Sequence, residues 1–122
     1  MGQELILFIL QEKLYIKDLI ISLDKSKFRF EVVNSAVEGI EKTLLELPSM
    51  LFLDIKMGDI GSQQVCRYLR NRHETKRIPI VLLTNTDMPK HHLFWALELG
   101  ANDFLVDPID ELGLQEKIKK FS

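Results

Sequence analysis

The sequence predicts a single α/β domain in which one parallel β-sheet carries helices on both faces. Short apolar runs alternate with amphipathic segments five times along the 122 residues, as in a chain of β-α units. Right-handed crossovers then place helices on the two faces of the sheet. Three of the apolar runs end in a polar residue, namely Asp54, Thr84 and Asp107. Parallel strands bring such ends to one rim, where open α/β sheets bind their ligands, so the site is expected there.

The first half of the chain supplies two β-α units. Residues 5–10 form an unbroken apolar run, typical of a strand buried on both faces. Apolar residues at helical spacing follow over residues 14–23, and alternation predicts a half-exposed strand over residues 28–32. Ser35 begins a capping box and therefore a second helix, which ends before Pro48.

The second half repeats the pattern. Its expected elements are a strand ending at Asp54, a helix over 64–72, a strand opened by Pro79, a helix over 89–99, a strand over 102–106 and a helix over 114–121. We therefore expect one domain over residues 1–122.

Composition excludes several classes of function. The 16 Lys and Arg residues against 18 Asp and Glu give a net charge of −2, which does not attract nucleic acid or an anionic membrane. The longest apolar run, residues 5–10, is too short to span a membrane, so a soluble, cytoplasmic protein is expected. The single cysteine, Cys66, occupies a packing position in a helix. No Walker A, GxGxxG, GxSxG or metal-spaced Cys/His motif is present.

Four blocks of the chain together resemble the receiver domain of two-component response regulators. These blocks are residues 51–57, 65–70, 78–84 and 96–106. The resemblance covers essentially the whole chain. It implies a flavodoxin-like (βα)5 fold with strand order 2-1-3-4-5.

The resemblance also implies roles for individual residues. Asp54 holds the position of the aspartate that accepts a phosphoryl group from a kinase phosphohistidine, and Thr84 that of the hydroxyl that binds the phosphoryl oxygens. The family holds Mg²⁺ with this aspartate, a pair of acids after the first strand and a backbone carbonyl. Here the pair reads Gln11-Glu12, in which Gln11 is a weak ligand, and the carbonyl belongs to Lys56. Mg²⁺ binding is therefore expected to be weakened.

One departure affects the charge of the site directly. Asp107 stands where the family has a lysine, followed in both cases by proline. At 4 Å and an effective dielectric of 20 a pair of unit charges is worth about 4 kcal/mol, so replacing a cation by an anion opposes phosphoryl transfer strongly. We hypothesise that the ammonium of Lys56 compensates by pairing with Asp54, Asp107 or both.

The expected fourth helix carries apolar residues around most of its circumference. Comparison with the family pattern predicts that Phe94 and Leu97 face the core, while Leu93 and Trp95 face outward. Phe104 matches the aromatic residue whose rotamer follows phosphorylation in the family. In receiver domains the fourth helix, fifth strand and fifth helix form the usual surface for dimerisation or for an output module. We therefore expect Leu93, Trp95 and Phe104 to contribute to an interface with a partner protein or a second copy.

Three functions follow, in order of preference. The first is a phosphorelay receiver domain with a degenerate phosphoacceptor site, which acts through protein contacts and is not an enzyme beyond phosphoryl acceptance and autodephosphorylation at Asp54. The second is a conventional Mg²⁺-dependent receiver that uses Lys56 as its cation. In both, a histidine kinase or phosphotransfer protein is the upstream partner. The third is a small flavodoxin-like enzyme or ligand-binding protein.

Overall fold

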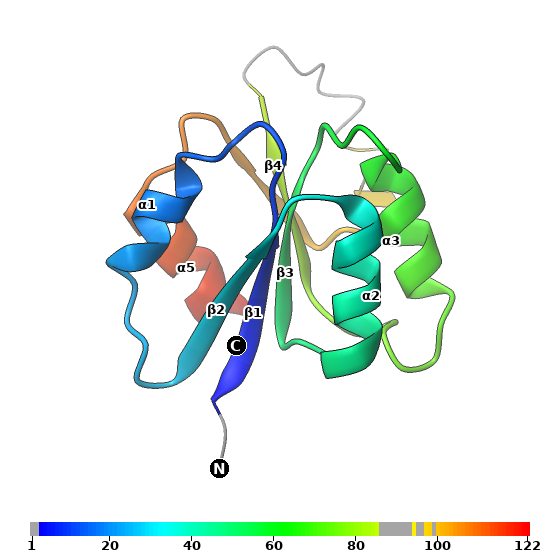
Figure 1. The fold of residues 1–122 in the computed structure, drawn as a ribbon, viewed down its shortest axis with the longest axis horizontal. Helices are drawn as coiled ribbons and strands as arrows, with labels where there is room; N and C mark the ends of the chain where they lie inside the picture. The colour runs from blue at the N-terminus through cyan, green and yellow to red at the C-terminus, as the bar shows by residue number, and fades with distance from the viewer. Residues whose placement is uncertain (1–2, 86–93, 95–96, 99) are drawn as a thin grey trace.

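The computed structural model describes residues 3–85, 94, 97–98 and 100–122. Strands and helices alternate along the chain as the sequence predicts (Figure 1). The elements are β1 (Glu4–Ile9), α1 (Ile16–Ile21), β2 (Phe28–Val33), α2 (Ala36–Glu46), β3 (Met50–Asp54), α3 (Ser62–Arg70), β4 (Ile80–Thr84), β5 (Asp103–Val106) and α5 (Glu111–Phe121). The helix expected over 89–99 lies mostly outside the described residues, and its described members are helical.

The five strands form one parallel sheet with the order β2-β1-β3-β4-β5, which confirms the predicted fold. Helices α1 and α5 cover one face, and α2 and α3 cover the other (Figure 1). The strand order reverses between β1 and β3, and in open α/β sheets ligands bind beyond the carboxyl ends of the strands at such a point. Asp54 is the last residue of β3 and lies at that point.

The sheet separates two apolar cores. On the side of α1 and α5, Phe8 of β1 stacks on Phe52 of β3 with ring centroids 4.6 Å apart. On the side of α2 and α3, Leu7 and Leu53 pack against Val65 and Leu69. Burial on both faces explains why β1, β3 and β4 read as unbroken apolar runs rather than alternating ones. The central strands are thus held rigidly, and their carboxyl ends are fixed in position.

Several helix boundaries differ from the predicted ones, among them both ends of α3, which was expected over residues 64–72. Two of the differences have a local reason. The first helix begins at Ile16 rather than near Leu14, which is exposed, because the residues after β1 turn their backbone toward Asp54. The last helix begins earlier than predicted because the Asp110 carboxylate accepts a hydrogen bond from the Gly113 N–H at 2.8 Å. No helix among the described residues is long and apolar enough to cross a membrane.

One expectation about the fourth helix is wrong. Phe94, expected to face the core, is 68% exposed. Leu97 does pack against the core on the side of α2 and α3, as does Phe104. Leu93 and Trp95, the expected outward anchors, lie outside the described residues.

Candidate functional site

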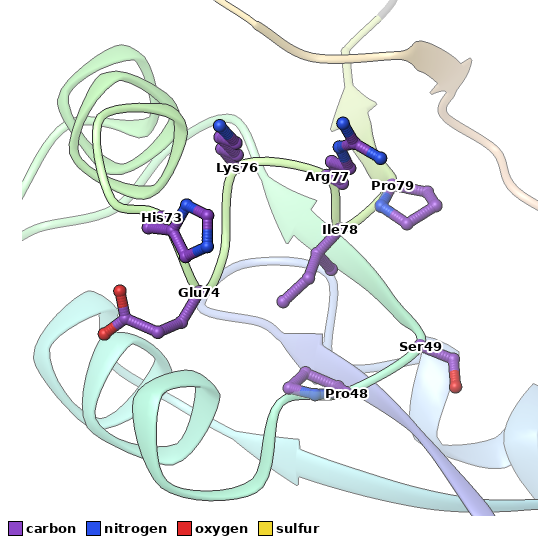
Figure 2. Close-up of a pocket in the computed structure, with 8 residues that line it drawn as sticks. All are labelled: Pro48, Ser49, His73, Glu74, Lys76, Arg77, Ile78 and Pro79. Carbon is purple, nitrogen blue, oxygen red and sulfur yellow. The ribbon is translucent and has the colours of Figure 1, made fainter.

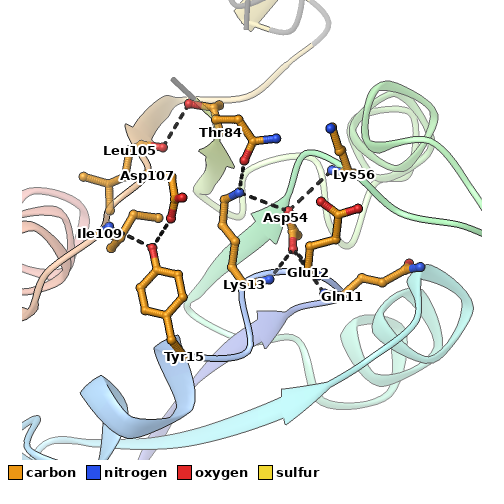
Figure 3. A network of polar contacts seen from close by, with 11 residues as sticks. Gln11, Glu12, Lys13, Tyr15, Asp54, Lys56, Thr84, Leu105, Asp107 and Ile109 are labelled. Atoms are coloured by element: carbon orange, nitrogen blue, oxygen red, sulfur yellow. Dashed lines mark hydrogen bonds and ion pairs between the residues drawn. The ribbon is translucent and has the colours of Figure 1, made fainter. Parts of the chain in front are cut away.

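The Asp54 carboxylate is buried and surrounded by hydrogen-bond donors (Figure 3). Its Oδ2 atom accepts backbone N–H bonds from three consecutive residues: Gln11 at 3.2 Å, Glu12 at 2.9 Å and Lys13 at 3.2 Å. Successive N–H groups that converge in this way form an anion-binding nest. The turn after β1 therefore stabilises the charge of a carboxylate carried by β3.

A lysine that the sequence analysis did not select supplies the cation. Lys13 Nζ lies 3.8 Å from Asp54 Oδ1, and Lys13 is only 3% exposed. The same ammonium group donates a hydrogen bond to the side-chain oxygen of Asn85, directly after β4. The signal available in the sequence was its position, immediately after the pair Gln11-Glu12 at the rim of the first strand.

Lys56 contacts Asp54 through its backbone. Its N–H lies 3.4 Å from Asp54 Oδ1, whereas its side chain is exposed. Among the described residues, the ion pair with Asp54 that we hypothesised for Lys56 is made by Lys13. The reason is geometric. Lys13 lies in the segment after β1, the strand that pairs with β3, and is buried, whereas the side chain of Lys56 is exposed to solvent.

The carboxylate of Asp107 has a hydrogen-bond partner, the hydroxyl of Tyr15. The Tyr15 hydroxyl donates a hydrogen bond to Asp107 Oδ1 and accepts one from the Ile109 N–H at 2.8 Å (Figure 3). Burial and the hydrogen bond with Asp107 raise the pKa of Tyr15 to about 12. The anion that replaces the family lysine is thereby partnered by a neutral donor from the segment between β1 and α1.

Thr84 lies where the resemblance places it, at the buried end of β4. Its Oγ1 donates to the Leu105 carbonyl of β5 at 3.1 Å. The Asp107 N–H in turn donates to the Thr84 carbonyl at 2.9 Å. The hydroxyl proton is therefore directed at β5 in this structure.

Gln11 and Glu12, the other side chains expected to hold the metal, do not converge with Asp54 in this structure. The Gln11 side-chain oxygen accepts the Gly58 N–H at 2.6 Å, and the Glu12 side chain is exposed. No cluster of three or more His, Cys, Asp or Glu side chains suited to a metal occurs in the described part of the chain. Mg²⁺ requires several oxygen ligands in octahedral geometry, and here one Asp54 oxygen is already occupied by three N–H groups. In this arrangement Asp54 Oδ2 and the Gln11 side-chain oxygen are occupied by N–H donors rather than free to bind the ion.

A hollow lies at the opposite end of the sheet (Figure 2). Its volume is about 550 Å³, and it lies beside the residues that precede β3 and β4. It is lined by Pro48, Ser49, His73, Glu74, Lys76, Arg77, Ile78 and Pro79. None of these residues was expected to function, and the hollow is separate from the carboxyl rim that carries Asp54.

A family model described as the response regulator receiver domain matches residues 6–119. The chain belongs to the response-regulator receiver-domain family. This membership removes the reason for considering a small flavodoxin-like enzyme. Receiver domains are generally signalling domains of two-component systems rather than enzymes, and they interact with histidine kinases and partner proteins.

Curated and solved relatives agree with this assignment. The response regulator PleD of Caulobacter vibrioides is 32% identical over 93 residues, which cover 74% of this chain and 20% of PleD. The chain thus spans about a fifth of that relative. A two-component response regulator from Clostridium difficile superposes with a TM-score of 0.84 at 26% identity, covering 98% of this chain and 95% of that one.

A third likeness bears on the cation site. The receiver domain of sensor histidine kinase PA1611 from Pseudomonas aeruginosa superposes with a TM-score of 0.83 at 19% identity, covering 98% of both chains. That structure holds a magnesium ion coordinated in its active-site cleft. The magnesium ion belongs to that relative, and at this identity the likeness shows the shared fold.

Proposed function

We propose that this receiver domain has a degenerate phosphoacceptor site at Asp54 and transmits its signal through protein contacts. The observation that carries the proposal is that both carboxylate oxygens are already engaged. Three backbone N–H groups bind Oδ2, and the Lys13 ammonium and Lys56 N–H approach Oδ1. A carboxylate in this arrangement is neutralised internally and is a weaker nucleophile.

The charge at the rim supports the same proposal. Phosphoryl transfer depends on cations that neutralise the transferring oxygens. Asp107 brings a negative charge to the position of the family lysine, and Tyr15, which is neutral, partners it. Lys13 offers one positive charge, which Asp54 already uses.

A second candidate is the conventionally phosphorylated, Mg²⁺-dependent receiver that uses Lys56 in place of the missing lysine. The position of Lys13 supports a variant of this candidate, since its buried ammonium lies 3.8 Å from Asp54. In this reading Lys13 would exchange Asp54 for the phosphoryl oxygens. The two candidates differ in whether Asp54 accepts a phosphoryl group.

The decisive experiment offers Asp54 a small phosphodonor or beryllofluoride together with Mg²⁺. We expect no adduct in the mass spectrum and no shift of the Thr84 and Phe104 amide signals. Asp54→Asn serves as the control for labelling elsewhere in the chain. A stable adduct at Asp54, with shifts at Thr84 and Phe104, would establish the conventional receiver instead.

The proposed contact surface comprises the fourth helix, β5 and α5. Its described apolar members include Phe94, Val106 and Leu112, which are 68%, 41% and 62% exposed. Asp103 joins β5 to α5, because Lys117 and Lys120 place their Nζ atoms 2.7 Å and 3.0 Å from its Oδ2. These ion pairs outweigh the effect of burial and lower the pKa of Asp103. The ion pairs therefore hold α5 against β5, the two elements that carry Val106 and Leu112.

Trp95 remains the proposed anchor of this surface, together with Leu93 and the half-buried Phe104. We expect Trp95→Glu to abolish association with a partner protein while the protein stays folded by circular dichroism. Sedimentation of the wild type alone separates self-association from partner binding. A wild type that is monomeric and binds no two-component partner would contradict the surface.

A further inference from the structure

We infer that the Lys13 ammonium takes the place of the divalent cation at Asp54, so that the site is neutralised by the chain itself and does not take up Mg²⁺. The inference deepens the proposed function and rests on it for the identity of the site. It concerns the counter-charge of Asp54 rather than phosphorylation. An Mg²⁺ titration therefore tests the inference, whereas a phosphodonor tests the proposed function.

Burial makes Lys13 and Asp54 depend on each other. Asp54 is fully buried and Lys13 is 3% exposed. A charge withdrawn from water to this extent needs a partner and hydrogen bonds. Lys13 Nζ lies 3.8 Å from Asp54 Oδ1 and also donates to Asn85, so the ammonium has an ion-pair partner at the end of β3 and a hydrogen-bond acceptor directly after β4.

The other oxygen of Asp54 is also unsuited to a metal. Donor N–H groups from Gln11, Glu12 and Lys13 point at Oδ2, where a cation would have to displace them. Gln11, the neutral member of the pair after β1, is engaged by the Gly58 N–H. A Cβ added at Gly58 would lie 2.8 Å from Gln11 Nε2, so the loop after β3 closes tightly on that side chain.

Lys13 also links the turn after β1 to the end of β4. Its backbone N–H and its ammonium bind the two oxygens of Asp54, while the ammonium binds Asn85. Asp54 and the residue that follows β4 are thus connected through one lysine side chain. The geometry of this rim is therefore set without a dissociable ion.

The test is an Mg²⁺ titration of the intact chain, followed by amide NMR at Gln11, Glu12, Asp54 and Thr84. We compare the wild type with Lys13→Met, which removes the ammonium and retains an apolar side chain of similar length. Lys17→Met is the matched control, because Lys17 is exposed and lies four residues further along the chain. Calcium titrated in parallel reports non-specific attraction to carboxylates.

We expect no saturable shift at Asp54 in the wild type or in Lys17→Met up to about 20 mM Mg²⁺, since the carboxylate lacks free ligand positions. Lys13→Met should bind Mg²⁺ at least roughly tenfold more tightly than the wild type, because the competing charge is gone. Saturable binding at Asp54 in the wild type that is unchanged in Lys13→Met would overturn the inference.

The wild type decides the question even if Lys13→Met does not fold. Saturable Mg²⁺ binding at the wild-type Asp54 amide below about 20 mM would overturn the inference by itself, because an occupied carboxylate excludes it. A wild type that is phosphorylated at Asp54 in EDTA would contradict the proposed function and retain the internal cation. A wild type that resists phosphodonors but binds Mg²⁺ at Asp54 would contradict the internal cation and retain the proposed function.

Discussion

Tyr15 links two segments that are far apart in the sequence. Its hydroxyl lies between the Asp107 carboxylate and the Ile109 N–H, so it acts as donor and acceptor at once. A hydrogen bond to a charged acceptor is stronger than a neutral one. The residue thereby stabilises the anion that departs from the family pattern and orders the chain between β5 and α5.

The first prediction concerns the ionisation of this hydroxyl. Because burial and Asp107 raise the pKa of Tyr15 to about 12, its phenolate should form late in an alkaline absorbance titration. A raised pKa favours the neutral form in the folded state. The resulting stability is complete below the unfolded-state pKa of about 10 and is lost as the pH rises toward 12.

Tyr15→Phe identifies the signal and tests its contribution. The variant should lose the late-titrating phenolate and about 1 kcal/mol of the free energy of unfolding at neutral pH, since Asp107 and Ile109 lose their partner. Urea denaturation measures the second effect. An unchanged alkaline titration in Tyr15→Phe would show that the late phenolate belongs to another residue.

At the scale of elements, α2 packs closely on β1 at a single glycine. A Cβ added at Gly39 would lie 2.7 Å from Ile9 Cγ1, with the end of the same side chain closer still. Ile9 is fully buried in the central strand, so it has little room to move. The absence of a side chain at Gly39 sets the distance between this helix and the sheet.

The second prediction follows from this contact. Gly39→Ala should lower the free energy of unfolding by about 1–3 kcal/mol through overpacking, measured by urea denaturation. Gly113→Ala in α5 is the matched control, because its nearest neighbours would lie at 3.2 and 3.4 Å. There, alanine should be neutral or stabilise by up to about 1 kcal/mol. Equal effects at both positions would refute the packing argument.

The starts of α2 and α1 show which helix boundaries can be predicted from neighbouring residues alone. The capping box at Ser35 was predictable because it depends on residues three apart, and the Glu38 N–H does bind Ser35 Oγ at 3.1 Å. The start of α1 was not predictable, because the N–H groups of Gln11, Glu12 and Lys13 donate to the Asp54 carboxylate of β3. An acceptor that is distant in the sequence therefore determines where this helix begins.

At the scale of the whole molecule, the sheet is covered on both faces and its interior excludes solvent. Cys66 of α3 is fully buried in the core on the α2–α3 side. Burial raises the pKa of its thiol to about 11. Because the thiolate is the reactive form, this cysteine is inert in the folded protein.

The third prediction uses Cys66 as a reporter of unfolding. Labelling by a thiol reagent at neutral pH should be slower in buffer than in denaturant by at least about a thousandfold, because the thiol reacts only after the core opens. Rates measured across a urea series should follow the global unfolding equilibrium. Fast labelling without denaturant would show that α3 opens separately from the rest of the domain.

The sequence by itself determined the alternation of elements, the strand order through family resemblance, and the placement of Asp54, Thr84 and Asp107 at one rim. Those features depend on local hydrophobic periodicity and on parallel strand direction. Only the tertiary structure decided which cation neutralises Asp54 and what partners Asp107. Lys13 and Asp54 are 41 positions apart, and Tyr15 and Asp107 are 92 apart. Such pairings depend on the paths of turns and on which buried charges find a partner, and no local pattern encodes that choice.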